Sequence, residues 1–292
     1  MKIALYGRGF TTNCSAQFNE LIALLQARNV ALSFYRPFYD FLQDACHFEV
    51  SSVETFDTTP PADTDCLLSI GGDGTFLRSL QHVRDSAIPV AGINFGRLGF
   101  LSAASFDDLP ATIDAILEKK YTIEERSLLE VKSDILPPDI FAYALNEVGV
   151  QRRSPAMISV RVQLDDNSLP TYWADGLLIA TPTGSTAYSM SVGGPIMSPT
   201  TKSFVLSPIA PHNLNIRSLV ISDDTVLSIT ADSRDDTVFL TIDNQLIEIP
   251  SGTKIGIQKA LFNFHIIRLH GSNFFNTICE KLSWGKDSRN LY

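Results

Sequence analysis

Short apolar runs alternate with helix-like segments along the first third of the chain. Runs with the length and composition of buried parallel strands lie at 2–6, 30–34, 66–70 and 90–93. Helical spacing of apolar residues occurs at Phe18, Leu21, Ile22 and Leu25, and again around 38–46 and 75–83. This alternation predicts an α/β unit built on a parallel sheet.

The pattern changes after a helical stretch at about 109–119. From Ile158 to Leu164 apolar and polar residues alternate, as they do in a strand with one buried face. Turn residues such as Asp165 and Asn167 follow this strand. Similar strand-like runs lie at 127–132, 143–150, 177–180, 226–229, 238–242 and 262–269. The second half is therefore predicted to be all-β.

These patterns predict three parts. The first is an α/β domain with a parallel sheet over 1–124, and the second is a β-rich, sandwich-like domain over 125–270. A last helical signal, at Phe274, Phe275, Ile278 and Leu282, predicts a C-terminal helical segment over 271–292. We expect this helix to return and pack on the first domain.

Charge and hydropathy exclude several classes of partner. The chain of 292 residues has 23 Lys and Arg against 32 Asp and Glu, a formal charge of −9, which argues against a nucleic-acid partner. Hydrophobic residues make up 45%, as in ordinary globular proteins. No apolar run approaches the roughly 18 residues of a membrane span, so we expect no membrane partner.

Cysteines and histidines carry no metal or disulfide signature. Four widely spaced cysteines show no C-x-x-C spacing, and five histidines form no H-E-x-x-H pair. The apolar run at 3–6 is too short for a signal peptide. We therefore expect a cytoplasmic protein without a metal site of its own, in which any metal arrives with a phosphate.

The most informative short motif is Gly71-Gly72-Asp73-Gly74-Thr75, which joins a strand-like run to a helical one. Glycines let the backbone approach a phosphate, and the amides of a helix N-terminus point at the anion. A carboxylate beside phosphates is repelled unless it binds Mg²⁺ or accepts a proton from an attacking hydroxyl. We assign Asp73 one of these tasks; the alternative is a tight turn in which Asp73 caps the helix.

Hydroxyl and amide groups dominate a second loop, at 175–189. Its Ser and Thr residues suit sugar and phosphate recognition, and Tyr188 can stack on a flat ring. An exposed Ser/Thr-rich surface loop is the alternative.

Two further elements are shorter. Asn146 and Glu147 sit side by side in an apolar run, where they can contact an adenine edge and ribose hydroxyls, or else form a solvated strand end. Arg97, in the glycine-containing stretch 93–101, can neutralise phosphate, although an ordinary βα loop is the alternative.

Together these motifs resemble the NAD kinase family. That family shows a G-G-D-G loop, an L-G-F segment, an Asn-Glu/Asp pair and a D-G-x-x-x-x-T-P-T-G-S-T-A-Y loop, and this chain has all four in that order. Matching stretches run from residue 3 to about 245, including Glu124-Glu125-Arg126 at the entry to the second domain. The resemblance implies an α/β domain, a β domain, and a dinucleotide held between them with help from a neighbouring subunit.

The resemblance also implies residue roles. Asp73 corresponds to the proposed base, Gly74 and Phe100 line the dinucleotide, and Asn146 with Glu147 contacts adenosine. Further residues that face the dinucleotide are Asp175, Thr186, Ala187, Tyr188 and Ser191. Asp175 would approach the nicotinamide half, from an adjacent subunit. Where the family often has Asp-Gly-Gln, this chain reads Asp243-Asn244-Gln245, which leaves a contact by Asn244 open.

The expected reaction is transfer of the γ-phosphoryl group of ATP, with Mg²⁺, to the 2′-hydroxyl of the adenosine ribose of NAD. A homodimer or homotetramer with shared sites is the expected assembly. Related lipid kinases also carry a G-G-D-G-T loop, but their later motifs differ. A lipid kinase and a non-catalytic NAD(P)-binding sensor remain the alternatives.

Overall fold

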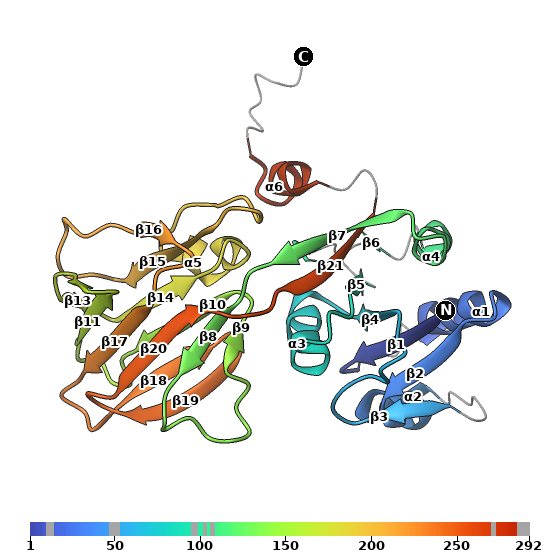
Figure 1. Cartoon of the computed structure of the whole chain (residues 1–292), viewed down its shortest axis with the longest axis horizontal. Helices are drawn as coiled ribbons and strands as arrows, with labels where there is room; N and C mark the ends of the chain where they lie inside the picture. Colours follow the sequence, from blue (N-terminus) through green and yellow to red (C-terminus); the bar gives the residue numbers. More distant parts are fainter. Residues whose placement is uncertain are drawn as a thin grey trace, which may run out of the picture. The chain divides into compact units, whose positions relative to one another are not determined.

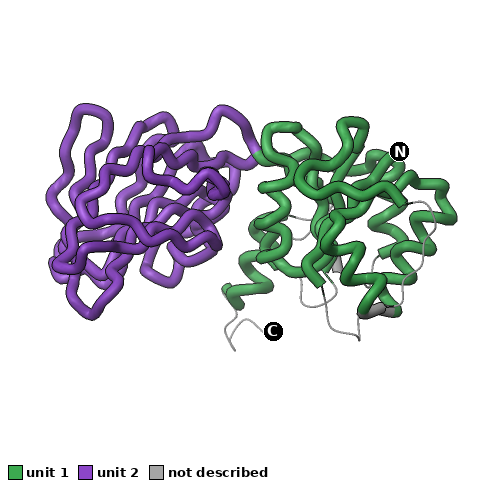
Figure 2. The backbone as a smooth tube through the Cα atoms, turned by 90° about the horizontal axis from the view of Figure 1, so that it is seen from below, with its two compact units in different colours: residues 1–125, 264–292 green, residues 126–263 purple. Residues whose placement is uncertain are grey.

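The computed structural model describes residues 1–9, 15–46, 53–94, 99–101, 104–105, 109–269 and 273–284. The chain divides into two compact units (Figure 2). Unit 1 comprises Met1–Glu125 and Phe264–Tyr292, and unit 2 comprises Arg126–Asn263. Each is described separately below.

Unit 1 is an α/β domain around one sheet of order β3-β2-β1-β4-β5-β21-β7, with β6 paired to β5 (Figure 1). Parallel pairing joins the strands from β3 through to β21. The strands are β1 Lys2–Gly7, β2 Ala31–Tyr35, β3 Glu54–Phe56, β4 Cys66–Ile70, β5 Val90–Asn94, β6 Ala104–Ser105, β7 Tyr121–Arg126 and β21 Phe264–Leu269. The helices are α1 Ser15–Ala27, α2 Arg36–Cys46, α3 Asp73–Val83, α4 Leu109–Leu117 and α6 Phe274–Lys281.

The core of unit 1 forms where apolar helix faces cover the sheet. All five residues of β4 are buried, as expected of a central parallel strand covered on both faces. In α1, Phe18, Leu21 and Leu25 are fully buried, and their helical spacing puts them on one face. The α/β prediction for this region is confirmed.

One predicted strand belongs to a different sheet from the one expected. We assigned residues 125–270 to the second domain, but β21 pairs in parallel with β5, where Ile266 lies opposite Val90. In Figure 1, β21 runs beside β7. The alternating pattern of a strand identifies its buried face but not its partner strand, so sequence alone did not reveal this return. The chain from Phe264 onward, α6 included, groups with unit 1.

Unit 2 consists of two antiparallel sheets, which confirms the predicted all-β, sandwich-like class. One sheet has the order β16-β15-β14-β10-β18-β19, and the other β12-β11-β17-β20-β8-β9 with β13 paired to β11. The first sheet contains β10 Glu147–Gln151, β14 Gly176–Ala180, β15 Ser203–Ile209, β16 Leu219–Ser222, β18 Thr237–Ile242 and β19 Gln245–Pro250. The second contains β8 Leu129–Lys132, β9 Tyr143–Ala144, β11 Ile158–Leu164, β12 Asn167–Ser168, β13 Tyr172–Ala174, β17 Leu227–Asp232 and β20 Lys254–Lys259.

Alternation of apolar and polar residues builds the core of unit 2. Val160 and Ile229 of one sheet pack in the same cluster as Val148 and Leu240 of the other. Within β11, the exposed Arg161 separates two buried valines, as the period of two requires. The two sheets are linked where the chain passes from β9 to β10 through Leu145 and Asn146.

Membrane crossing by a helix finds no support in the parts of the chain that the structure describes. None of the helices there combines the length and the apolar character that a bilayer span needs.

The buried aromatic pair of Phe264 and Phe76 ties β21 to α3. Their ring centroids lie 5.7 Å apart in an edge-on arrangement, and Phe264 is 1% exposed. We expect Phe264→Ala to lower the free energy of unfolding by about 3–5 kcal/mol because it removes a buried ring and leaves a cavity. Urea unfolding measures this, with the exposed Phe275→Ala as the matched control. Equal stabilities of the two variants would contradict the role given to this pair.

Candidate active site

The glycine-rich turn joins β4 to α3 as predicted. Gly71 has a φ of +140°, and a Cβ atom there would lie 2.7 Å from the Thr75 hydroxyl oxygen, so a side chain does not fit. Gly72 is the N-cap residue and α3 begins at Asp73. The N-terminus of α3 thus lies directly after the glycine turn, where an anion is favoured. Within this turn the Thr75 amide donates to the Gly72 carbonyl over 2.9 Å.

Two backbone amides orient the Asp73 carboxylate. Phe100 donates its N–H to Oδ2 over 2.7 Å, and Leu101 donates to Oδ1 over 3.3 Å. Gly99 permits this approach, since a Cβ atom there would lie 1.9 Å from Oδ1. The cap of α3 is Gly72, so Asp73 has a different role from the helix cap considered as the alternative. The structure thus brings Asp73 and Phe100 together, whereas Arg97 lies outside the described residues.

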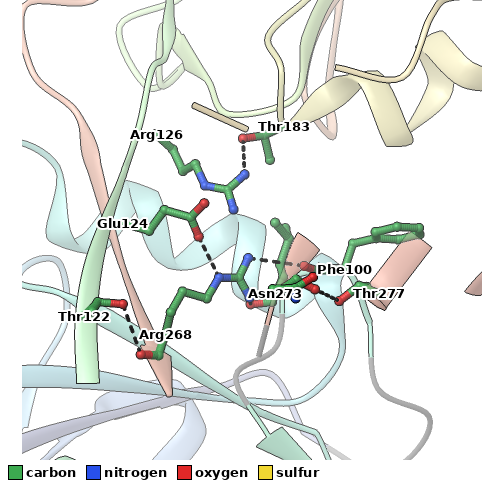
Figure 3. A network of polar contacts seen from close by, with 9 residues as sticks. Phe100, Thr122, Glu124, Arg126, Thr183, Arg268, Asn273 and Thr277 are labelled. Carbon is green, nitrogen blue, oxygen red and sulfur yellow. Dashed lines mark hydrogen bonds and ion pairs between the residues drawn. The ribbon is translucent and has the colours of Figure 1, made fainter. Parts of the chain in front are cut away.

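An arginine that the sequence analysis missed supports this loop from β21. Arg268 donates from its two Nη atoms to the carbonyls of Phe100 and Leu101, over 3.4 and 3.5 Å (Figure 3). Its Nε donates to Glu124 of β7 over 2.8 Å. Arg268 thus contacts the carbonyls of the same two residues whose amides hold Asp73. Arg268 and Glu124 are 144 positions apart, which explains why no local pattern indicated the pair.

In unit 2, the Thr-rich loop packs on the segment that contains Asn146. Thr181 donates its hydroxyl to the Leu145 carbonyl, over 2.5 Å, and its amide to the Asn146 carbonyl, over 2.9 Å. A Cβ atom on Gly184 would lie 2.1 Å from that same Asn146 oxygen, so the close approach requires glycine. The two predicted motifs therefore form one cluster.

Most hydroxyls of this loop point inward. Thr181, Thr183, Ser185 and Ser189 are buried, so the alternative of an exposed Ser/Thr-rich loop is wrong. Thr183 accepts a hydrogen bond from Nη1 of the buried Arg126 over 3.1 Å (Figure 3).

Other predicted residues of the loop are more accessible to solvent. Thr186 and Ala187 are half-buried, Ser191 is exposed at the end of the short helix α5 (Tyr188–Ser191), and Tyr188 is 39% exposed. A partly exposed ring beside a rigid loop can bind a flat ligand by stacking.

Glu147 is a buried carboxyl group at the start of β10. Its Oε2 atom is buried without a hydrogen-bond partner among the described residues. Burial, and secondly the charge of Asp243, raises the pKa of Glu147 to about 8, against the effect of a backbone hydrogen bond from Tyr188. Glu147 does begin a strand and is half-buried, as the alternative held, but its Oε2 atom is buried and not solvated. Near neutral pH this carboxyl group is largely protonated.

Asp243 is the second carboxylate of this cluster. It accepts hydrogen bonds from the backbone amides of residues 145–147, and it adjoins the exposed Asn244. Burial raises the pKa of Asp243 to about 6, and the three amides partly offset this effect. A contact by Asn244 was left open by the sequence; in the structure its neighbour Asp243 accepts from the three amides of residues 145–147.

Asp175 lies apart from the other predicted residues of unit 2. It precedes β14 and forms an ion pair with Arg152 over 2.9 Å, whereas Thr181 follows the other end of this five-residue strand. At about 3.3 Å per residue, the strand separates the two ends by roughly 17 Å. Within one subunit Asp175 is therefore not part of the cluster around Asn146.

No group of three or more His, Cys, Asp or Glu side chains that could hold a metal ion occurs among the described residues. Magnesium bound to nucleotide phosphates takes one or two carboxylates at most from the protein. Asp73, beside the N-terminal amides of α3, fits such a role.

The raised pKa of Glu147 predicts a pH-dependent stability. The folded chain keeps the proton of Glu147 up to about pH 8, whereas the unfolded chain releases it near pH 4.5. The free energy of unfolding therefore decreases as pH rises between these values. Asp243, shifted from 3.8 to about 6, acts in the same direction at lower pH.

We expect urea unfolding to show a loss of stability between pH 6 and pH 8 that is smaller in Glu147→Gln than in the wild type. Glu248→Gln, at an exposed position of β19, is the matched control and retains the wild-type loss. An equal loss in all three proteins would show that Glu147 is ionised in the folded chain at pH 6.

Comparisons with known proteins identify the relatives of the chain. The model of the ATP-NAD kinase N-terminal domain matches residues 23–121, and that of the C-terminal domain matches 145–269. The NAD kinase of Porphyromonas gingivalis is 41% identical over 285 residues, which cover 97% of this chain and 98% of the relative. That of Christiangramia forsetii is 39% identical over 300 residues, covering 99% of this chain and 100% of the relative.

Solved structures share the fold. An NAD kinase from Archaeoglobus fulgidus in complex with ATP superposes with a TM-score of 0.75 at 26% identity, covering 97% of this chain and 99% of that one. Yeast NADH kinase complexed with NADH has a TM-score of 0.85 at 23% identity, covering 100% and 90%. The resemblance found in the sequence motifs is confirmed, and the chain belongs to the NAD kinase family.

Proposed function

We propose that this chain transfers the γ-phosphoryl group of ATP to the 2′-hydroxyl of the adenosine ribose of NAD, which yields NADP and ADP. The observation that carries the proposal is the Asp73 carboxylate, held by the amides of Phe100 and Leu101 at the start of α3. Family membership supplies the substrates, because relatives along the full length of the chain are NAD kinases.

The glycine-rich turn acts mainly through its backbone. Phosphoryl transfer passes through a loose transition state in which positioning and neutralisation of oxygen charge dominate. We assign the amides of Gly72 and Gly74 to the phosphate chain of ATP. The amides of Gly71 and Thr75, which the sequence also suggested, instead donate to the carbonyls of Ile93 and Gly72. Magnesium enters as part of the nucleotide substrate and neutralises phosphate charge.

Asp73 acts as the general base. One carboxylate oxygen takes the proton of the 2′-hydroxyl while the hydroxyl oxygen bonds to the γ-phosphorus and the bond to the β-phosphate oxygen breaks. The two amide donors and the glycine at position 99 keep the carboxylate in one orientation. Fixed orientation matters because the reaction rate falls steeply when the reacting groups are misplaced.

The cluster in unit 2 recognises the dinucleotide. We assign Asn146 and Glu147 to the adenosine and Tyr188 to stacking on a ring. Phe100, Thr186, Ala187 and Ser191 are assigned to further contacts, with Arg97 on a phosphate and Asn244 at the rim.

Asp175 supports a shared site in a homodimer or homotetramer. It is separated from the unit 2 cluster by the length of β14, so we assign it to the dinucleotide of an adjacent subunit. We place the reaction in the cytoplasm, where ATP and NAD are supplied and thiols such as that of the buried Cys66 stay reduced.

The role of Asp73 predicts a large loss of turnover in Asp73→Asn. The amide keeps one oxygen for the Phe100 N–H but is no base, so kcat should fall by about 10²- to 10⁴-fold while the affinity for NAD changes little. The assay incubates the purified chain with NAD, ATP and Mg²⁺ and reads NADP with an NADP-specific dehydrogenase. The control is Asp57→Asn, which removes an exposed ion pair with Arg36.

Near-normal turnover of Asp73→Asn would refute the base assignment. Absence of NADP from the wild type, also with NADH and with polyphosphate as donor, would refute the proposed reaction. Saturable dinucleotide binding would then indicate a sensor, and binding to vesicles would indicate a lipid acceptor.

The role of Tyr188 predicts an effect mainly on KM, in contrast to the effect on kcat expected for Asp73. A stacking side chain stabilises ground and transition states alike, so Tyr188→Ala should raise KM for NAD more than it lowers kcat. Trp173→Ala removes a ring that is 50% exposed elsewhere in unit 2 and should leave KM unchanged. Equal KM values for the two variants would remove Tyr188 from the site.

A further inference from the structure

The chain crosses from one sheet of unit 2 to the other immediately before Glu147. β9 ends at Ala144 in one sheet and β10 begins at Glu147 in the other, so Leu145 and Asn146 belong to neither. Backbone amides at such a crossing need acceptors from outside the strand ladders, because an unpaired buried amide is costly. The residues proposed to contact adenosine lie at this crossing.

One carboxylate accepts all the amides of the crossing. Asp243 Oδ2 accepts from Leu145 over 2.8 Å, and Oδ1 accepts from Asn146 and Glu147 over 2.8 and 3.0 Å. The Asp243 amide in turn donates to the Glu147 carbonyl over 2.9 Å. Four hydrogen bonds therefore connect a single residue to a segment about a hundred positions earlier.

The conformation of the β18–β19 turn places the Asp243 carboxylate. Its φ is +51°, in the left-handed region that Asp and Asn tolerate better than most residues. Ile242 and Gln245 pair across this hairpin, which leaves Asp243 and Asn244 as the turn.

Gln245 holds the chain shortly before the crossing, at Phe141. Its Oε1 accepts from the Phe141 amide over 3.1 Å, and its Nε2 donates to the Phe141 carbonyl over 2.7 Å. Asn244, between the two anchoring residues, is exposed.

The carbonyls of the crossing are held from the other side. Thr181 donates its hydroxyl to Leu145 and its amide to Asn146. With the amides held by Asp243, the backbone of Asn146 is fixed on both sides and its side chain is left to meet a ligand.

We infer that Asp243, assisted by Gln245, is a positioning residue that sets the backbone of Asn146 and Glu147 for recognition of the dinucleotide. The inference rests on the proposed function for the identity of the ligand. Asp243 acts through the crossing and does not itself touch the substrate. Its substitution therefore weakens the binding of NAD and has little effect on the use of ATP.

The test uses Asp243→Asn in the full chain. A carboxamide has one oxygen instead of two, and its NH₂ group faces amide donors, so the three bonds cannot all persist. We expect Kd and KM for NAD to rise at least 10-fold, while kcat and KM for ATP change less than threefold. We also expect faster hydrogen exchange at the amides of residues 145–147.

The matched control is Asp223→Asn, which alters another buried carboxylate of unit 2, paired with Lys259. We expect it to lower Tm but to leave Kd for NAD and exchange at 145–147 as in the wild type. Gln245→Ala removes the second anchor alone and serves where Asp243→Asn does not fold; it should raise Kd for NAD at least threefold.

A folded Asp243→Asn variant with wild-type affinity for NAD overturns the inference, as does a parallel rise in KM for ATP. An equal rise of Kd in Asp223→Asn would assign the effect to general destabilisation. A wild type that makes no NADP refutes the proposed function instead, and hydrogen exchange at 145–147 still decides whether Asp243 holds the crossing.

Discussion

A carboxylate that must keep one orientation needs hydrogen-bond donors, and backbone amides are donors that cannot rotate away. In unit 1 the amides of Phe100 and Leu101 hold the Asp73 carboxylate, and the glycine at position 99 makes room for that carboxylate. Arg268 donates to the carbonyls of the same two residues. The order of the sheet serves this arrangement. β5 leads toward the loop that contains Phe100, and its neighbour β21 supplies Arg268. The position of one acidic side chain thus depends on β4, which leads into the glycine turn, and on β5 and β21.

Unit 2 also pairs a carboxylate with backbone amides, but there the carboxylate holds the backbone in place. There the carboxylate of Asp243 is the fixed element and the amides of a crossing between sheets are held by it. The nearby carboxyl of Glu147 remains mostly protonated at neutral pH because a second charge beside Asp243 would be poorly solvated. A neutral Glu147 can donate as well as accept a hydrogen bond, which widens the contacts open to it.

Local sequence patterns predicted the parts of this molecule that depend on local spacing. The glycine turn before α3 and the alternation in β11 were correct because each is determined by neighbouring residues. The assignment of residues 264–269 to the second domain was wrong, because a strand's partner can lie far away in the sequence and β21 pairs with β5. Arg268 and Asp243 were missed for the same reason, since their partners lie 144 and 98 residues away. Arg97 remains a prediction, and so do the roles of the other site residues.

The return of β21 makes unit 2 an insertion within unit 1. The chain leaves the first sheet after β7 and rejoins it at β21, and these two strands are neighbours there. On the ribosome, residues 126–263 therefore emerge and can fold before β21 has been synthesised. Until then the first sheet lacks the strand that lies between β5 and β7. The loop around Asp73 acquires Arg268 only after all of unit 2 has been synthesised, so the inserted domain can fold before the phosphate-binding domain is complete.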